Sequence, residues 1–127
     1  MALARVGFFS ELRHGEPDGP SLRDAIGKLR ADKQPIVAYL RQAAALAVTG
    51  GTSAYDVLDP ALRRIGPLSV LTDGAWIWPS DLPYYVEQYE VDLPAAFLRH
   101  GASLHWTPPA LSDRELNDVE DRLFRQR

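Results

Sequence analysis

His14, Glu16 and Asp18 are the side chains whose types and spacing come nearest to a reactive or metal-binding site. They are close enough to share one loop, and two further histidines, His100 and His105, lie far along the chain. Zinc sites need three or four ligands held in a supported geometry. The sequence has no His-x₃-His pair and no His-Glu-x-x-His motif, so we expect no metal site and no cofactor.

The segment Leu12-Arg13-His14-Gly15-Glu16 also resembles the Arg-His-Gly-Glu signature of the histidine phosphatase superfamily. The resemblance implies that His14 would be the phosphorylated nucleophile and Arg13 a ligand of the phosphoryl oxygens. Such domains are longer, place the motif after the first strand of an α/β sheet, and need a second histidine. Leu98-Arg99-His100-Gly101 is a candidate for it, although this pattern is typical of the end of a helix. A phosphoryl-transfer enzyme is therefore an alternative hypothesis, and whether the chain is an enzyme stays open, leaning towards no.

The stretch of residues 76–89 is the richest in aromatic side chains, with two tryptophans and three tyrosines. Tryptophan and tyrosine dominate the hot spots of protein interfaces, because they bury a large area at a low cost in entropy. Most of these rings are expected in the core, but a small protein has difficulty covering all of them. We predict that a partner protein contacts Trp78, Tyr84, Asp81, Glu87 and Glu90. The three acidic side chains among them suit a basic partner.

A β-hairpin is expected to position these aromatic residues. Asp-Gly between two β-prone runs is the strong signal of a two-residue hairpin turn, and Asp73-Gly74 lies between residues 68–72 and 75–78. This register pairs Thr72 with Ala75 and Leu71 with Trp76. Alternation then divides the side chains into one face with Ser69, Leu71, Trp76 and Trp78 and another with Leu68, Val70 and Ile77. Both faces are apolar, so helices have to pack on the hairpin.

About five helices are predicted from apolar spacing and capping signals, packed on this hairpin or on a small antiparallel sheet that contains it. Their expected starts are Ser21, Pro35, Asp59-Pro60, Ser80 or Asp81, Asp92-Pro94 and Ser112. The helix from Pro35 has an apolar stripe to Val48 and should end at Gly50-Gly51, the helix from Asp59-Pro60 should end at Gly66, and the helix from Asp92-Pro94 should end at Gly101. The helix after Asp81 should bury Leu82, Tyr85, Val86 and Tyr89. The last helix has the clearest start, because Ser112 and Glu115 form a capping box. Residues 5–9 are either a further strand or a helical turn.

Composition limits the class of protein. The chain has 127 residues, no cysteine and a net charge of −3. Residues 1–50 carry seven basic and five acidic side chains, and residues 51–127 carry seven and twelve. The length suits one globular domain over residues 1–127, and the lack of cysteine excludes disulfides and thiolate chemistry. An acidic chain attracts nucleic acid poorly, and neither a membrane-spanning run nor a signal peptide is present, so we expect a cytoplasmic α+β domain.

A longer resemblance covers most of the chain up to about residue 100. Phe8-Phe9-Ser10-Glu11-Leu12-Arg13-His14-Gly15 and Thr72-Asp73-Gly74-Ala75-Trp76-Ile77-Trp78-Pro79 are similar to segments of a group of small uncharacterised bacterial proteins with no established activity. Small acidic α+β domains are also similar in character to immunity proteins, which block a toxin. Our leading hypothesis is a small non-catalytic protein-binding module, with neutralisation of a toxin by occlusion as its most concrete form. A structural homo-oligomer, in which the hairpin extends a sheet across a two-fold axis, is a further alternative.

Overall fold

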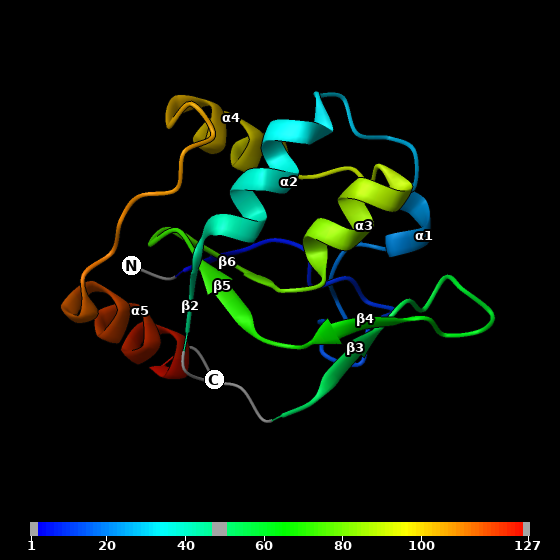
Figure 1. The fold of residues 1–127 in the computed structure, drawn as a ribbon, viewed down its shortest axis with the longest axis horizontal. Helices are drawn as coiled ribbons and strands as arrows, with labels where there is room; N and C mark the ends of the chain where they lie inside the picture. The colour runs from blue at the N-terminus through cyan, green and yellow to red at the C-terminus, as the bar shows by residue number, and fades with distance from the viewer. Residues whose placement is uncertain (1–2, 47–50, 126–127) are drawn as a thin grey trace.

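The computed structural model describes residues 3–46 and 51–125, which form five helices and six strands (Figure 1). The helices are α1 (Leu22–Ala25), α2 (Lys33–Gln42), α3 (Leu82–Tyr89), α4 (Ala95–Ser103) and α5 (Asp113–Arg125). The strands are β1 (Ala4–Arg5), β2 (Ala44–Ala45), β3 (Ser53–Tyr55), β4 (Arg64–Pro67), β5 (Val70–Thr72) and β6 (Trp76–Pro79). The predicted α+β class with about five helices is confirmed.

The main sheet has the strand order β1-β6-β5-β2. Its neighbours are antiparallel except for β1, which runs parallel to β6, so the sheet is mixed rather than antiparallel as expected. The N-terminal segment, which the sequence left undecided, is therefore a strand. A second, two-stranded antiparallel sheet is formed by β3 and β4.

Buried side chains form two clusters on the two faces of the main sheet. Leu71 and Trp78 belong to the larger cluster, which includes residues of α2, α3 and α4, and Ile77 belongs to the smaller cluster with Val119 and Leu123 of α5. In Figure 1, α2, α3 and α4 lie above the sheet and α5 lies below it. The predicted division of the hairpin side chains between two faces is confirmed. The expectation that one small domain leaves some rings of this hairpin uncovered is wrong for Trp78, which is 0 % exposed.

The hairpin itself has a different register from the predicted one. Leu71 pairs with Trp78 and Thr72 with Ile77, a shift of two residues that leaves a four-residue connection. The carboxylate of Asp73 accepts hydrogen bonds from the amides of residues 75 and 76, and the Thr72 hydroxyl accepts one from Gly74. These side chains satisfy the loop amides, so the longer turn replaces the two-residue turn.

Two predicted helices are shortened or replaced because tertiary pairing outweighs local propensity. α2 starts at the Asp32 cap and ends at Gln42, after which β2 pairs with the open edge of β5. Val48 and Gly50, at the predicted end of this helix, lie outside the described residues. The helix predicted from Asp59 to Gly66 is a turn followed by β4.

The C-terminal helices follow the sequence more closely. In α3 the predicted Leu82, Tyr85 and Val86 are fully buried, whereas Tyr89 is only partly buried. In α5 the capping box is confirmed by reciprocal bonds between Ser112 and Glu115 of 3.0 and 3.1 Å. The predicted end of α4 at Gly101 is wrong, because Gly101 lies inside the helix. A Cβ atom there would lie 2.0 Å from the ring of Trp106, so glycine permits close packing at this position.

Candidate functional site

Two of the predicted partner-binding residues belong to the interior. Trp78 is 0 % exposed, packs against the rings of Tyr39 and Phe97, and donates its indole N–H to the carbonyl oxygen of Leu40 at 3.2 Å. Asp81 is 1 % exposed. Their assignment to a partner-binding surface is therefore wrong, because helices cover the hairpin face that carries Trp78 and Asp81 is buried at the start of α3.

The other three predicted contact residues lie at the surface but already have partners within the chain. The Tyr84 hydroxyl donates to the buried carboxylate of Asp56 at 2.7 Å, and burial together with this bond raises the pKa of Tyr84. Glu87 pairs with Arg41 of α2 at 3.1 Å, which lowers the pKa of Glu87. Glu90 lies 3.9 Å from the ammonium of Lys33. The cations of α2 thus compensate Glu87 of α3 and Glu90 at its end, and the structure does not assemble the five residues into one acidic binding surface.

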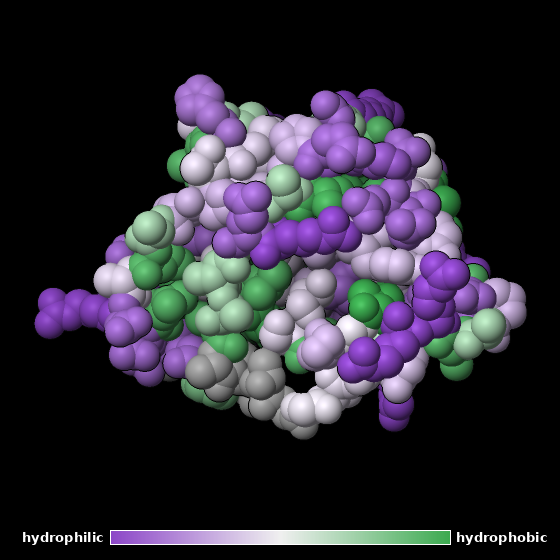
Figure 2. Space-filling view, viewed as in Figure 1, coloured by the Kyte–Doolittle hydropathy of each residue, from purple (hydrophilic) through white to green (hydrophobic). Residues whose placement is uncertain are grey.

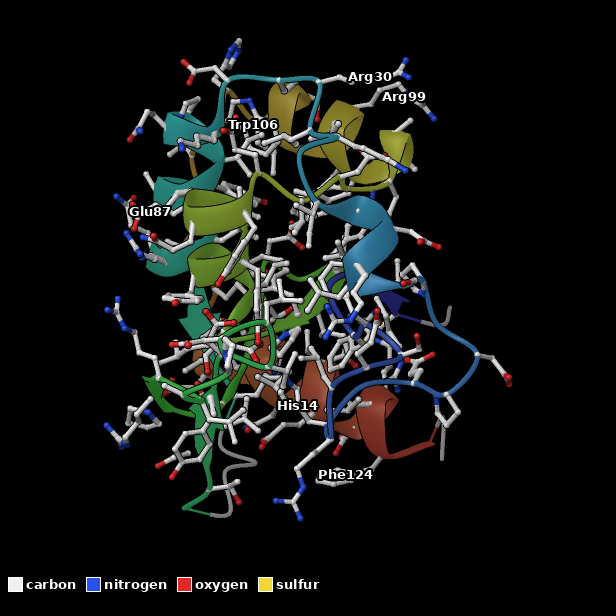
Figure 3. All side chains as sticks on the ribbon, turned by 90° about the vertical axis from the view of Figure 1, so that its right-hand side faces the viewer. His14, Arg30, Glu87, Arg99, Trp106 and Phe124 are labelled. Atoms are coloured by element: carbon white, nitrogen blue, oxygen red, sulfur yellow. The ribbon has the colours of Figure 1, made fainter. Side chains whose placement is uncertain are left out.

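His14 and His100, which a histidine-phosphatase mechanism would bring together, contact different buried carboxylates. The Nε2 atom of His14 lies 2.9 Å from Asp81, and that of His100 lies 3.1 Å from Asp73. These aspartates flank β6 at its opposite ends, and Figure 3 places His14 in the lower half and Arg99, the neighbour of His100, near the top. The second histidine of that mechanism is therefore not brought to His14. Among the described residues, no three His, Asp or Glu side chains are grouped to hold a metal.

The segment around His14 is instead tied to the fold by Glu11. Its carboxylate accepts hydrogen bonds from the backbone amides of Leu22 and Arg23, at 2.7 and 3.0 Å, and from the Ser21 hydroxyl. Desolvation raises the pKa of Glu11, but these bonds outweigh it and lower the pKa to about 2. A carboxylate at the first turn of α1 also suits the positive end of a helix. Glu11 therefore fixes the loop of residues 10–20 against α1.

A pocket of about 460 Å³ lies between this loop, α1 and the segment before α4. Its volume falls within the range of cavities that hold small ligands or anchoring side chains. The floor is apolar and the edge carries three carboxylates. We call it the acid-rimmed pocket; its floor is Val6, Phe8, Phe9, Ala25 and Leu93, and its rim is Glu16, Asp24 and Asp92.

Backbone hydrogen bonds hold the walls of the acid-rimmed pocket. The amide of Asp92 donates to the carbonyl oxygen of Ala25 at 2.9 Å, and the amide of Gly27 donates to that of Tyr89 at 2.9 Å. On the opposite wall, Gly7 has a φ of +84°, and a Cβ atom there would lie 2.8 Å from Leu82. Glycine therefore allows the chain to turn from β1 into the loop over α3, so the pocket is formed before any ligand arrives.

The charge of the rim favours cations. Arg5 lies 3.4 Å from Glu16 and over the ring of Phe8, so one of the three carboxylates has a cationic partner. Asp92 uses one oxygen to accept the amide of Leu93, and Asp24 forms no ion pair within the described residues. The rim thus carries three negative charges against one positive charge above an apolar floor. A cationic group attached to an apolar body fits this arrangement.

Sequence reasoning did not find this pocket. Glu16, as a possible metal ligand, is the only rim residue among the candidate site residues of the sequence, and the residues of the floor come from three segments that are distant in the chain. The signals were present in the apolar residues 6–9 and in the acids near positions 24 and 92, but nothing in their spacing joins them.

Comparison with protein-family models, with curated proteins and with solved structures finds no match for this chain. Within residues 3–46 and 51–125, none of the helices combines the length and the hydrophobicity needed to cross a bilayer.

Proposed function

We propose that the chain is a small non-catalytic protein-binding module that holds a basic side chain of a partner protein in the acid-rimmed pocket. The observation that carries the proposal is the combination of a preformed apolar floor with three carboxylates and a single cation at the edge. The predicted basic partner is retained, while the contact site moves from residues 76–90 to the pocket.

An arginine or lysine side chain is suited to such a site. Its aliphatic stem can pack against Phe8 and Leu93 while its charged head stays at the partly hydrated rim near Asp24 and Asp92. Because the head group is not fully desolvated, its attraction to the carboxylates is not cancelled by the cost of burying charge. The acidic rim also attracts a basic partner before contact and raises the rate of association.

The alternative hypothesis, a phosphoryl-transfer enzyme that uses His14, has less support. Glu11 caps α1, Asp73 fixes the hairpin turn, and Asp81 lies behind His14, so each is engaged in joining segments of the chain. Residues 8–15 and 72–79 are the two segments similar to the small uncharacterised bacterial proteins. These contacts give both segments a role in holding the fold together. They favour a structural role for these polar residues, which the interaction that we propose does not use.

The most specific form of the proposal is neutralisation of a toxin, in which the bound module covers the working surface of its partner. We further propose that this takes place in the cytoplasm. A partner that binds through the acid-rimmed pocket should then lose its own activity when the module is added in equal amount.

The test is affinity capture from the native host with four matched proteins. Asp24→Asn and Asp92→Asn remove rim charge without changing side-chain size, and the exposed Asp18→Asn serves as a control outside the pocket. The wild type and Asp18→Asn should retain the same basic protein, and each rim variant should bind it at least about tenfold more weakly. A partner that binds all four proteins equally would contradict the proposal.

A further inference from the structure

The loop of residues 56–63, between β3 and β4, presents an apolar side chain at its outer end. Leu62 is 56 % exposed and has a φ of +52°, a left-handed conformation that costs a leucine about 1–2 kcal/mol. In Figure 1 this loop extends from the body, and Figure 2 shows hydrophobic atoms at its outer end beside strongly hydrophilic side chains. Among the large hydrophobic residues that the structure describes, Leu62 is the most exposed.

The loop is held in this shape by hydrogen bonds to two aspartates. The amide of Leu62 donates to the carbonyl oxygen of Asp59 at 2.8 Å, and the amide of Ala61 donates to the Asp59 carboxylate. The buried Asp56 donates its amide to the carbonyl oxygen of Arg63 and accepts the hydroxyl of Tyr89 at 2.6 Å. A loop fixed in this way loses little conformational entropy when it binds.

The charges beside Leu62 are positive. Arg63 and Arg64 are exposed, and neither forms an ion pair within the described residues; the guanidinium of Arg64 donates to the Ser53 hydroxyl at 3.2 Å. The two acids of the loop are engaged within the chain: the carboxylate of the partly buried Asp59 accepts the amide of Ala61, and that of the buried Asp56 accepts the hydroxyls of Tyr84 and Tyr89. The loop therefore offers one apolar side chain followed by two guanidinium groups.

These features complement the acid-rimmed pocket, which has an apolar floor and a negative edge. We infer that the partner surface that fits this loop is the acid-rimmed pocket of a second copy of the chain. Leu62 enters the pocket against Phe8 and Leu93, and Arg63 and Arg64 reach the rim carboxylates Asp24 and Asp92. The inference rests on the proposed function of the pocket as a site for basic groups and names one occupant.

The interface joins two different surfaces of the chain. The outer end of the loop and α1, which forms one wall of the pocket, both lie on the right-hand side of Figure 1. Two copies that face each other can therefore exchange loops about a two-fold axis and close a dimer, so the association is limited rather than open-ended.

Sedimentation velocity over a range of concentrations up to about 1 mM tests the inference. The wild type should change from monomer to dimer, with weaker association at high salt. The variants Arg63→Glu/Arg64→Glu and Asp24→Arg/Asp92→Arg should each stay monomeric, because the loop and the pocket then carry charges of the same sign. An equal mixture of the two should form dimers, because the negative loop of the first variant fits the positive pocket of the second. Recovery on mixing also shows that both variants are folded.

Arg30→Glu/Arg99→Glu is the matched control, since both arginines are exposed and Figure 3 places them together at the top of the molecule. This variant should dimerise like the wild type. A wild type that stays monomeric at every concentration, or a dimer that the loop and pocket variants leave unchanged, would overturn the inference. Binding of the cationic probe phenethylamine distinguishes the two proposals: if the probe binds at the pocket of a monomeric wild type, the dimer is refuted while the proposed function stands.

Discussion

Glu11 provides a sharp test of how the segment resembling a catalytic motif contributes to stability. Its carboxylate receives two backbone amides and one hydroxyl at the start of α1, and its pKa falls from 4.5 to about 2 on folding. A shift of this size stabilises the folded state by at most about 3–4 kcal/mol. Because the side chain is partly exposed, solvent screening reduces the contribution to about 1–2 kcal/mol, which agrees with the usual value of a helix cap.

The substitution Glu11→Gln keeps the size of the side chain and removes its charge. Since the pKa is lower in the folded state, the stabilisation is fully present above about pH 4.5 and is lost as the pH falls towards 2. Urea unfolding at pH 7 should therefore show the variant to be less stable by about 1–2 kcal/mol, and the difference should shrink steadily below pH 4.5.

The exposed loop residue Asp18, changed to Asn, is the control and should alter the free energy of unfolding by less than about 0.5 kcal/mol. If Glu11→Gln were as stable as the wild type at pH 7, the capping role would be refuted. A difference that persisted unchanged at pH 3 would show that the lost contact does not depend on the carboxylate charge.

Three further predictions concern the core and the tyrosines. Trp78→Ala should lower the free energy of unfolding by about 3–5 kcal/mol in urea, whereas an exposed anchor would leave it nearly unchanged. Gly101→Ala should destabilise by at least about 1 kcal/mol because the new methyl group meets Trp106; a gain in stability, as in an exposed helix, would refute this packing. The hydrogen bond to Asp56 and burial raise the pKa of Tyr89 to about 12, so this part of the stability is present below pH 10 and is lost as the pH rises towards 12. Absorbance titration should show that Tyr89→Phe removes a late-ionising phenol, and loss of an ordinary one would contradict the assignment.

Short-range signals in the sequence were sufficient for several elements. The capping box of Ser112 and Glu115 depends on residues within one turn, and the apolar face of α3 depends on helical spacing alone, so both are confirmed. The alternation of side chains in β5 and β6 was also predictable, since a register shift of two leaves each side chain on its original face.

Features that depend on distant contacts were not predictable. The alanines at 44 and 45 favour a helix locally, but pairing with β5 makes them a strand. Trp78 was misplaced because the sequence does not show that α2 and α4 bring Tyr39 and Phe97 over its face of the sheet. The acid-rimmed pocket combines residues from three separate segments, and a backbone hydrogen bond between Asp92 and Ala25 joins two of them.

The measurement that tests the central claim most directly is a titration of the protein with phenethylamine, phenethyl alcohol and phenylacetate, followed by the amide NMR signals of the residues that line the pocket. We predict that the amine binds most tightly, with a Kd of about 1 mM, and the carboxylate least. Asp24→Asn/Asp92→Asn should remove the preference for the amine but not the binding of the alcohol. Equal affinity for all three compounds, or shifts located away from Phe8, Ala25 and Leu93, would contradict a cation-selective pocket.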